Sequence, residues 1–338
     1  MLEAVMTGPG RIEFRDVPIP DVGPGEVRIK VSSFGICGSD IHVFHGRHPF
    51  TSYPIIQGHE FSGTIDAVGD GVNSLEIGDR VTVEPSIVCG RCYHCRSGRY
   101  NICDNIKVMG FQVDGCQREY FVVPADRVVP IPDDIPFEVG AMIEPVAVAV
   151  HALERSGFRR GSNLLILGAG TIGLLTLQVA RALGASSAVV VDLVDMRLEL
   201  AGRLGADSVI DVRGEELADG VRRSFGPDGA DLIIECVGSE DALEGAVQVA
   251  RKGTRITVVG VIGGRPGISM GLVQDRELEL VGSLMYMRGD FEKAIDLISR
   301  GSIDPERLIT LRLGFPELYR AYVEADDKSA NVKVIVSV

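Results

Sequence analysis

The stretch NLLILGAGTIGLLTLQVARALG, residues 163–184, contains a short apolar run, a glycine-rich turn and a run with the period of an amphipathic helix. This order predicts a buried strand, a tight turn of the form G-x-G-x-x-G and a helix that begins at the turn. Gly168 permits the tight turn, Gly170 lets a phosphate approach the backbone N–H groups, and Gly173 lets the helix pack closely on the strand. The stretch therefore predicts a site for a dinucleotide.

The residues that follow indicate which dinucleotide is bound. Asp192 ends the next apolar run, nineteen residues after Gly173, where an acidic side chain accepts hydrogen bonds from the adenosine ribose. Its charge would repel a 2′-phosphate, and neither Leu193 nor Val194 supplies a cation that offsets this repulsion. The sequence therefore favours NAD over NADP. Arg197 lies either along the adenosine ribose or on the solvated face of a helix.

The pattern of apolar runs divides the chain near residue 145. From residue 163 to residue 260, strand-like and helical runs alternate at least four times, which predicts a doubly wound parallel sheet. Before residue 145, short β-type runs alternate with Gly, Asp and Asn turns, which is typical of an antiparallel, barrel-like domain. The last portion does not continue the alternation, and its terminal run NVKVIVSV, residues 331–338, could return to the first sheet. The fold class is therefore α/β with a second, β-rich domain.

Composition and charge narrow the class of partner. The 338 residues contain 47 acidic and 34 basic side chains, a net charge of −13, which disfavours nucleic acids and anionic membranes as partners. The start of the chain has the features of neither a secretory signal nor a membrane span. We therefore expect a cytoplasmic protein that binds a small molecule.

Four of the seven cysteines lie within fifteen residues, with the spacing C-x2-C-x2-C-x7-C. Two CxxC turns and a returning fourth thiol are the arrangement of a closed structural zinc site. Disulfides are disfavoured in a reducing compartment, and an iron–sulfur run would have its fourth cysteine closer to the third and followed by proline. A site with four protein ligands leaves no position for substrate. The predicted ligands are Cys89, Cys92, Cys95 and Cys103.

A second group of metal-binding side chains comes from two separate turns. GICGSDIH, residues 35–42, contains Cys37, and GHEFSG, residues 58–63, contains His59 and Glu60. One thiol, one imidazole and one carboxylate could hold zinc with the fourth position open, as a catalytic site requires. Singly, a cysteine or a histidine is more often a buried or surface residue without a metal.

Taken together, these motifs resemble those of the zinc-dependent medium-chain dehydrogenase/reductases, and most of all their polyol and secondary-alcohol branch. The resemblance also rests on IEPVAVAVHA, residues 143–152, and covers essentially the whole chain. It implies a GroES-like catalytic domain that is interrupted by a Rossmann domain. The implied bounds are 1–145 and 290–338 for the catalytic domain, 86–108 for its structural-zinc lobe, and 146–289 for the NAD-binding domain.

The resemblance implies a role for individual residues as well. Cys37 and His59 bind a catalytic zinc whose shell is completed by Glu60, by Glu144 or by water. Ser39 takes the proton of the alcohol and passes it through the nicotinamide ribose to His42, so the implied catalytic residues are Ser39, His42 and Glu60. The expected cofactors are two zinc ions per chain and NAD, and the NAD site is expected to include Thr171, Ile172, Val237 and Val261 with the glycines, Asp192 and Arg197.

These expectations describe a zinc- and NAD-dependent enzyme that interconverts a secondary alcohol or polyol and its ketone. An enzyme of the threonine 3-dehydrogenase type and a catalytically silent, nucleotide-binding or redox-sensing protein are the alternatives. Sorbitol dehydrogenases typically have an arginine before the tyrosine that corresponds to Tyr286, and this chain has Met285 there, which leaves a less polar alcohol open. Members of the family are dimers or tetramers, and we expect a homotetramer.

Overall fold

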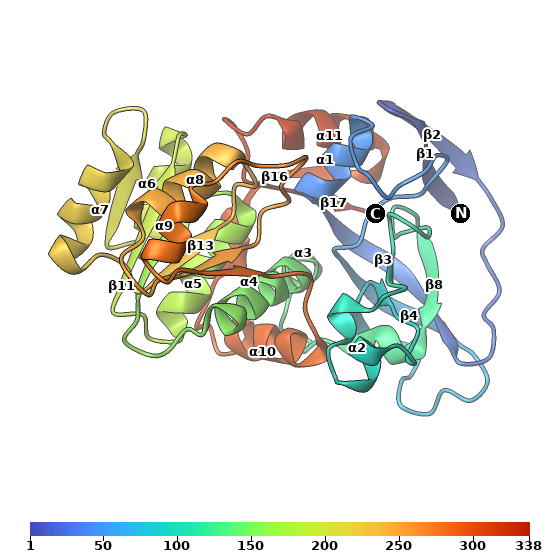
Figure 1. The fold of residues 1–338 in the computed structure, drawn as a ribbon. Coiled ribbons are helices and arrows are strands. Elements are labelled where there is room, and N and C mark those ends of the chain that lie inside the picture. Colours follow the sequence, from blue (N-terminus) through green and yellow to red (C-terminus); the bar gives the residue numbers. More distant parts are fainter. The chain divides into compact units, whose positions relative to one another are not determined.

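The computed structural model describes all 338 residues, which form two compact units (Figure 1). The chain leaves the first unit at the start of helix α4 (Ile143–Ser156) and returns to it after Tyr286. A short segment after residue 299 is again part of the second unit. The first unit comprises residues 1–144, 287–299 and 305–338, and the second comprises residues 145–286 and 300–304.

The second unit is built on a six-stranded sheet that is parallel throughout. Its strand order is β12-β11-β10-β13-β14-β15, so the chain builds one half outward from β10 and then the other half in the opposite direction. This reversal is the switch point at which dinucleotides bind in doubly wound sheets, and it confirms the predicted fold class. The strands are β10 (Asn163–Leu167), β11 (Ser187–Asp192), β12 (Ser208–Asp211), β13 (Leu232–Glu235), β14 (Arg255–Val258) and β15 (Glu279–Gly282).

Helices follow the strands of this sheet, and their apolar side chains form one core with it. The segment 300–304 is tied to this unit by Gln178, whose Nε2 donates to the carbonyl of Asp304 at 3.1 Å and whose Oε1 accepts from the Asp304 N–H at 2.7 Å. No helix in the structure combines the length and the apolar character needed to cross a bilayer. The helices of the unit after α4 are α5 (Thr171–Ala182), α6 (Asp195–Arg203), α7 (Leu217–Phe225), η3 (Gly226–Asp228), α8 (Glu240–Val249) and α9 (Met270–Asp275).

The first unit is built on a seven-stranded, mostly antiparallel sheet of order β16-β17-β3-β4-β5-β9, with β8 paired to β3. The terminal run pairs antiparallel with β3, with Val334 opposite Ile36, which confirms that the end of the chain returns to the first sheet. The strands are β3 (Glu26–Ile36), β4 (Phe61–Val68), β5 (Arg80–Val83), β8 (Tyr120–Pro124), β9 (Val128–Pro130), β16 (Ile309–Gly314) and β17 (Lys333–Ser337).

Two small two-stranded sheets complete the first unit. The first, β1 with β2, is a hairpin at the start of the chain that the sequence pattern did not reveal, and the second, β6 with β7, closes the base of the four-cysteine lobe. The remaining elements are β1 (Leu2–Gly8), β2 (Arg11–Asp16), α1 (Gly38–Phe44), β6 (Ser86–Ile87), α2 (Tyr93–Arg96), η1 (Tyr100–Ile102), β7 (Lys107–Val108), η2 (Ala125–Arg127), α3 (Phe137–Gly140), α10 (Arg288–Ser299), η4 (Pro305–Leu308), η5 (Phe315–Glu317) and α11 (Leu318–Asp326).

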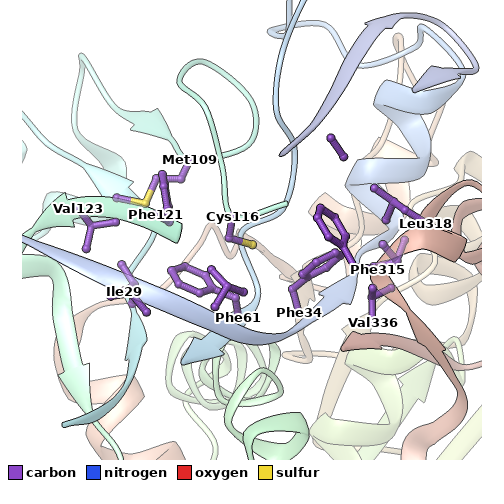
Figure 2. Packing of buried hydrophobic residues seen from close by; sticks show 14 of the residues in the cluster. Ile29, Phe34, Phe61, Met109, Cys116, Phe121, Val123, Phe315, Leu318 and Val336 are labelled. Atoms are coloured by element: carbon purple, nitrogen blue, oxygen red, sulfur yellow. The ribbon is translucent and has the colours of Figure 1, made fainter. Parts of the chain in front are cut away.

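Aromatic and branched side chains from distant parts of the chain form the core of the first unit (Figure 2). Phe34 of β3 meets Phe315 edge to face at 5.9 Å between ring centroids, and Phe61 of β4 meets Phe121 at 5.7 Å. The free thiol of Cys116 lies within this core, where burial raises its pKa well above the usual value. This core fixes the ends of β3 and β4, from which the metal-binding side chains project.

Candidate metal centres and nucleotide site

Cys37, His59 and Glu60 meet where two neighbouring strands end. Cys37 directly follows β3 and caps α1, while His59 and Glu60 directly precede β4. Because β3 and β4 are antiparallel, with Phe34 opposite Phe61, the end of one strand lies beside the start of the other. One potential ligand atom from each of the three residues lies within 4.8 Å of the other two. A thiol, an imidazole and a carboxylate at this separation suit a zinc site with an open position.

The turn before His59 requires a glycine. Gly58 has a φ of 93°, a left-handed conformation that favours glycine. A Cβ at this position would lie 2.7 Å from Cys116 Sγ and 2.9 Å from Gln117 Cγ. The backbone of Gly58 therefore packs directly on the core, and this close packing sets the direction in which His59 leaves the turn.

Asp40 contacts both Cys37 and His59, and sequence reasoning missed it. It is fully buried, and its Oδ2 accepts a hydrogen bond from the Cys37 N–H at 2.9 Å. Its Oδ1 lies 3.5 Å from His59 Nδ1, and neither of these two buried atoms has a hydrogen-bond partner. Metal-bound imidazoles usually donate their second N–H to a carboxylate, so this geometry leaves Nε2 of His59 for the metal. The residues therefore fit a zinc ion.

A buried lysine also reaches the group. The ammonium of Lys333, the first residue of β17, forms an ion pair with Oε2 of Glu60, and both side chains are buried. Burial opposes the charged form, but the carboxylate of Glu60, and beyond it Cys37 and Glu144, raise the pKa of Lys333 above its usual value. Glu144, the second residue of α4, is buried in the same unit but does not belong to the group of three within 4.8 Å.

The two residues expected to carry the proton lie on α1. Ser39 is half-buried and His42 is exposed, and a spacing of three residues places them on the same face of the helix. Partial burial, and after it the charges of Lys328 and Arg47, lower the pKa of His42 from its usual 6.5. His42 is therefore neutral, and able to accept a proton, over the whole range above its lowered pKa.

The four cysteines of the lobe form a second compact group, separate from the first. Their sulfur atoms lie within 4.8 Å of one another and all four thiols are free. Backbone N–H groups point at the sulfurs: Cys92 donates to Cys89 at 3.4 Å, and Cys89 donates to Cys103 at 3.3 Å. Hydrogen bonds from Arg91 and Cys92 lower the pKa of Cys89 to about 6. At Cys89 these donors favour the thiolate, the form that binds zinc.

The lobe has almost no apolar core of its own. Between residues 89 and 106, only Asn101 and Cys103 are buried. A segment this poor in buried apolar surface cannot hold one conformation by packing alone. A metal ion bound by the four thiolates would supply the missing binding energy.

In the second unit, the three glycines of the G-x-G-x-x-G turn have the surroundings that their expected roles require. Gly168 has a φ of 97°, and a Cβ there would lie 2.9 Å from Val237 Cγ2. A Cβ on Gly173 would collide with the carbonyl oxygen of Gly168. Gly170, in contrast, faces open space, with only an atom of Arg197 as near as 4.0 Å. The backbone at Gly170 can therefore be approached by a pyrophosphate, beside Thr171 and Ile172 at the start of α5.

Asp192 ends β11 at the same edge of the sheet. Its Oδ2 accepts from the Ala169 N–H at 2.6 Å, and its Oδ1 accepts from the N–H groups of Leu193 and Val194 at 2.7 and 2.9 Å. These bonds fix the carboxylate beside the glycine turn and leave it with free acceptor capacity. Arg197 lies near enough for its charge to act on Asp192, and burial lowers the pKa of Arg197.

Two exposed valines lie at the same edge of the sheet, one after β13 and one after β14. Val237 follows β13 and is 53% exposed, and Val261 follows β14 and is 69% exposed. Sequence reasoning missed the residue that holds the first of these loops, Glu235, whose Oε1 accepts from the N–H groups of Val237 and Gly238 at 2.6 and 2.8 Å. Burial raises the pKa of Glu235. The edge thus offers two exposed apolar side chains, one of them on a loop that Glu235 holds in place. Such a surface suits a nucleotide ring.

Comparison with family models matches both parts of the chain. Residues 23–133 match the model of the alcohol dehydrogenase GroES-like domain, and residues 171–300 match that of the zinc-binding dehydrogenases. The sorbitol dehydrogenase of Bacillus subtilis is 35% identical over 315 residues, covering 92% of this chain and 89% of the relative. A D-xylulose reductase of Saccharomyces cerevisiae is 34% identical over 342 residues, covering 98% and 96%.

Solved structures show the same similarity over the full length. The crystal structure of a protein named a short chain alcohol dehydrogenase, from Escherichia coli CFT073 and in complex with NADH, has a TM-score of 0.93 and 34% identity, covering 100% of this chain and 99% of that one. A zinc-binding dehydrogenase from Sinorhizobium meliloti 1021, bound to NADP, has a TM-score of 0.93 and 33% identity, with the same coverage. Similar chains thus take either cofactor.

Proposed function

The chain belongs to the zinc-dependent alcohol dehydrogenases of the medium-chain family, and on that premise we propose that its polyol or secondary-alcohol chemistry takes place at Cys37 and His59, with NAD as hydride acceptor. It is an oxidoreductase, which rules out the alternative of a catalytically silent, nucleotide-binding or redox-sensing protein. The single observation that carries the proposal is the open group of thiol, imidazole and carboxylate, braced by the buried Asp40.

The residues around the first metal site would each have a separate role in the reaction: metal binding, orientation of His59 and proton transfer. Cys37 and His59 would hold a zinc ion, which supplies a Lewis acid that lowers the pKa of the substrate hydroxyl. Asp40 would hold the ring of His59 in the orientation that keeps Nε2 toward the metal. Ser39 would accept the hydroxyl proton, and His42, on the same face of α1, would deliver it to solvent.

The second unit would bind NAD at the edge formed by Gly170, Asp192 and the exposed valines. The cofactor supplies the acceptor for the hydride that leaves the carbinol carbon. Asp192 would accept hydrogen bonds from the ribose hydroxyls, and its negative charge would oppose a 2′-phosphate. The test is a panel of D-sorbitol, a short diol, a simple secondary alcohol and L-threonine, assayed with NAD and with NADP by the absorbance of the reduced cofactor. Turnover with NADP alone would contradict the proposal.

Asp192→Ala is expected to raise the KM for NAD roughly tenfold to hundredfold, because a hydrogen bond to a charged group contributes about 1.5–3 kcal/mol. The KM for NADP should fall at the same time, since the repulsion of the 2′-phosphate is removed. Asp195→Ala is the matched control, because Asp195 begins α6 at an exposed position and pairs with Arg213. Equal changes for the two cofactors would contradict the role of Asp192.

His42→Gln is expected to slow alcohol oxidation by on the order of a hundredfold, since a positioned base contributes about 10²-fold or more. An added imidazole buffer should restore part of the rate in the variant and not in the parent protein. In the parent protein, the lowered pKa of His42 predicts that the relay is lost only as the pH falls below about 6.5. His45→Gln is the control, because His45 lies at the end of the same helix and its Nε2 pairs with Oδ2 of Asp326 at 2.8 Å. A variant that matches the parent rate at every buffer concentration would contradict the relay.

Two further expectations belong to the proposal. The four-cysteine lobe would hold a second, structural zinc ion, for which the clustered free thiols and the N–H donors are the support. The chain would assemble as a homo-oligomer, and a tetramer is favoured. Support for assembly comes from β15, the last strand of the six-stranded sheet, whose outer edge is unpaired and whose Leu280 is exposed, as is the nearby Leu284.

A further inference from the structure

Lys333 reaches the open metal site from the far end of the chain. It lies 273 residues after Glu60 and is brought to it by the pairing of β17 with β3. Its ammonium pairs with Oε2 of Glu60 and also donates to the carbonyl oxygen of Ile36 at 3.3 Å, one residue before Cys37. Lys333 and Glu60 are each about 98% buried, so neither charge is screened by solvent.

The backbone of β3 is shaped to admit this pair. A Cβ on Gly35 would lie 2.7 Å from Cε and 3.0 Å from Nζ of Lys333, and would also collide with Oε2 of Glu60. The Gly35 N–H in turn donates to the carbonyl oxygen of Glu60 at 2.8 Å. Any side chain at position 35 would therefore displace the ion pair, so the strand, the lysine and the carboxylate fit one another.

This arrangement limits how Glu60 can meet a metal ion. If both carboxylate oxygens bound the ion together with Cys37 and His59, four positions would be filled and none would remain for substrate. Lys333 pairs with Oε2, so only the other carboxylate oxygen of Glu60 is free of this ion pair and available to a metal. Its charge also offsets one of the acidic groups around the site, Cys37, Glu60 and Glu144.

We propose that Lys333 is a positioning residue that restrains Glu60 to at most one bond to the metal and so keeps the substrate position open. The inference rests on the proposed zinc site at Cys37 and His59. Without Lys333, both oxygens of Glu60 would be free to bind the ion, and the site would gain negative charge. The site should then release its metal more slowly, and the turnover of the enzyme should fall.

Lys333→Met is the test, with metal release and a cobalt spectrum as readouts besides activity. We expect the release of metal to a chelator to slow about tenfold and kcat to fall about tenfold to a hundredfold, the usual range for residues that orient ligands. In the Co²⁺-substituted protein, the visible absorption of the open site should weaken, since five-coordinate Co²⁺ absorbs less than four-coordinate Co²⁺. The difference spectrum against Cys37→Ser isolates this site from the four-cysteine lobe.

Lys333→Arg should keep the parent spectrum, because it keeps the charge, and Lys30→Met, at an exposed position on β3, is the control. A purely structural ion pair predicts the opposite sign, a looser site with faster metal release. Faster or unchanged release together with an unchanged cobalt band would overturn the proposal. If Lys333→Met does not fold, Gly35→Ala displaces the pair with both charges kept, and the same outcomes decide. A parent protein that takes up no Co²⁺ at this site would instead contradict the zinc site itself.

Discussion

Cys37→Ser is expected to lower the turnover of alcohol oxidation by on the order of 10³-fold while both units keep their fold. The thiolate is one of the proposed zinc ligands of the open site, and a hydroxyl in its place is a poor zinc ligand at neutral pH. Loss of the metal removes several kcal/mol of transition-state stabilisation, and each 1.36 kcal/mol is a factor of ten in rate. Turnover is measured with saturating NAD and alcohol, and the fold by circular dichroism.

The fold should survive because Cys37 lies at the end of β3 and outside the packed core of the first unit. Binding of NAD should also survive, because the residues expected to bind it belong to the second unit. A variant that retains the parent turnover would show that the chemistry does not depend on this thiol. Loss of NAD binding and of the far-ultraviolet signal would show that Cys37 is structural.

Cys95→Ser is expected to have the opposite profile, with a large loss of stability and a smaller loss of intrinsic turnover. Structural zinc sites contribute on the order of 10 kcal/mol of binding free energy, and the proposed zinc would order a lobe with only two buried residues between positions 89 and 106. Without one of its four thiolates, the lobe should unfold locally. The measurements are the midpoint of thermal unfolding and proteolytic cleavage between residues 89 and 103.

Ser97→Ala is the matched control for Cys95→Ser. Ser97 lies in the same lobe and is exposed, and its hydroxyl donates to the carbonyl oxygen of His94 at 3.1 Å. It should keep the parent unfolding midpoint and resist cleavage. If Cys95→Ser were as stable and as resistant as Ser97→Ala, the four thiols would not hold a metal that orders the lobe.

The parts of the molecule that the sequence could predict depend on contacts between near neighbours in the chain. The glycine turn at 168–173, the CxxC turns of the lobe and the alternation of strand and helix after residue 163 all have a fixed local spacing. Alternating strands and helices whose connections have one hand predict a parallel sheet covered by helices, as observed. The hairpin of β1 and β2 lacked such a signal and was found only in the structure.

The residues that escaped prediction act over long distances or resemble common surface residues. Lys333 and Glu60 are 273 residues apart, and no periodicity connects them. The one available signal was a lysine directly before the apolar run Val334–Val336 of the terminal strand, since a lysine rarely becomes buried unless it is paired. Asp40 is only three residues from Cys37, but a lone carboxylate on a helix is usually solvated. Its burial against His59 depends on the pairing of β3 with β4.

The most direct test of the whole account measures bound zinc and the rate of NAD reduction together in the parent protein, Cys37→Ser and Cys95→Ser. We expect zinc in both sites of the parent protein, loss of the open-site zinc with loss of turnover in Cys37→Ser, and loss of the lobe zinc with turnover largely retained below the unfolding temperature in Cys95→Ser. Turnover that follows the zinc of the four-cysteine lobe, or that persists in Cys37→Ser without zinc in the open site, would contradict it.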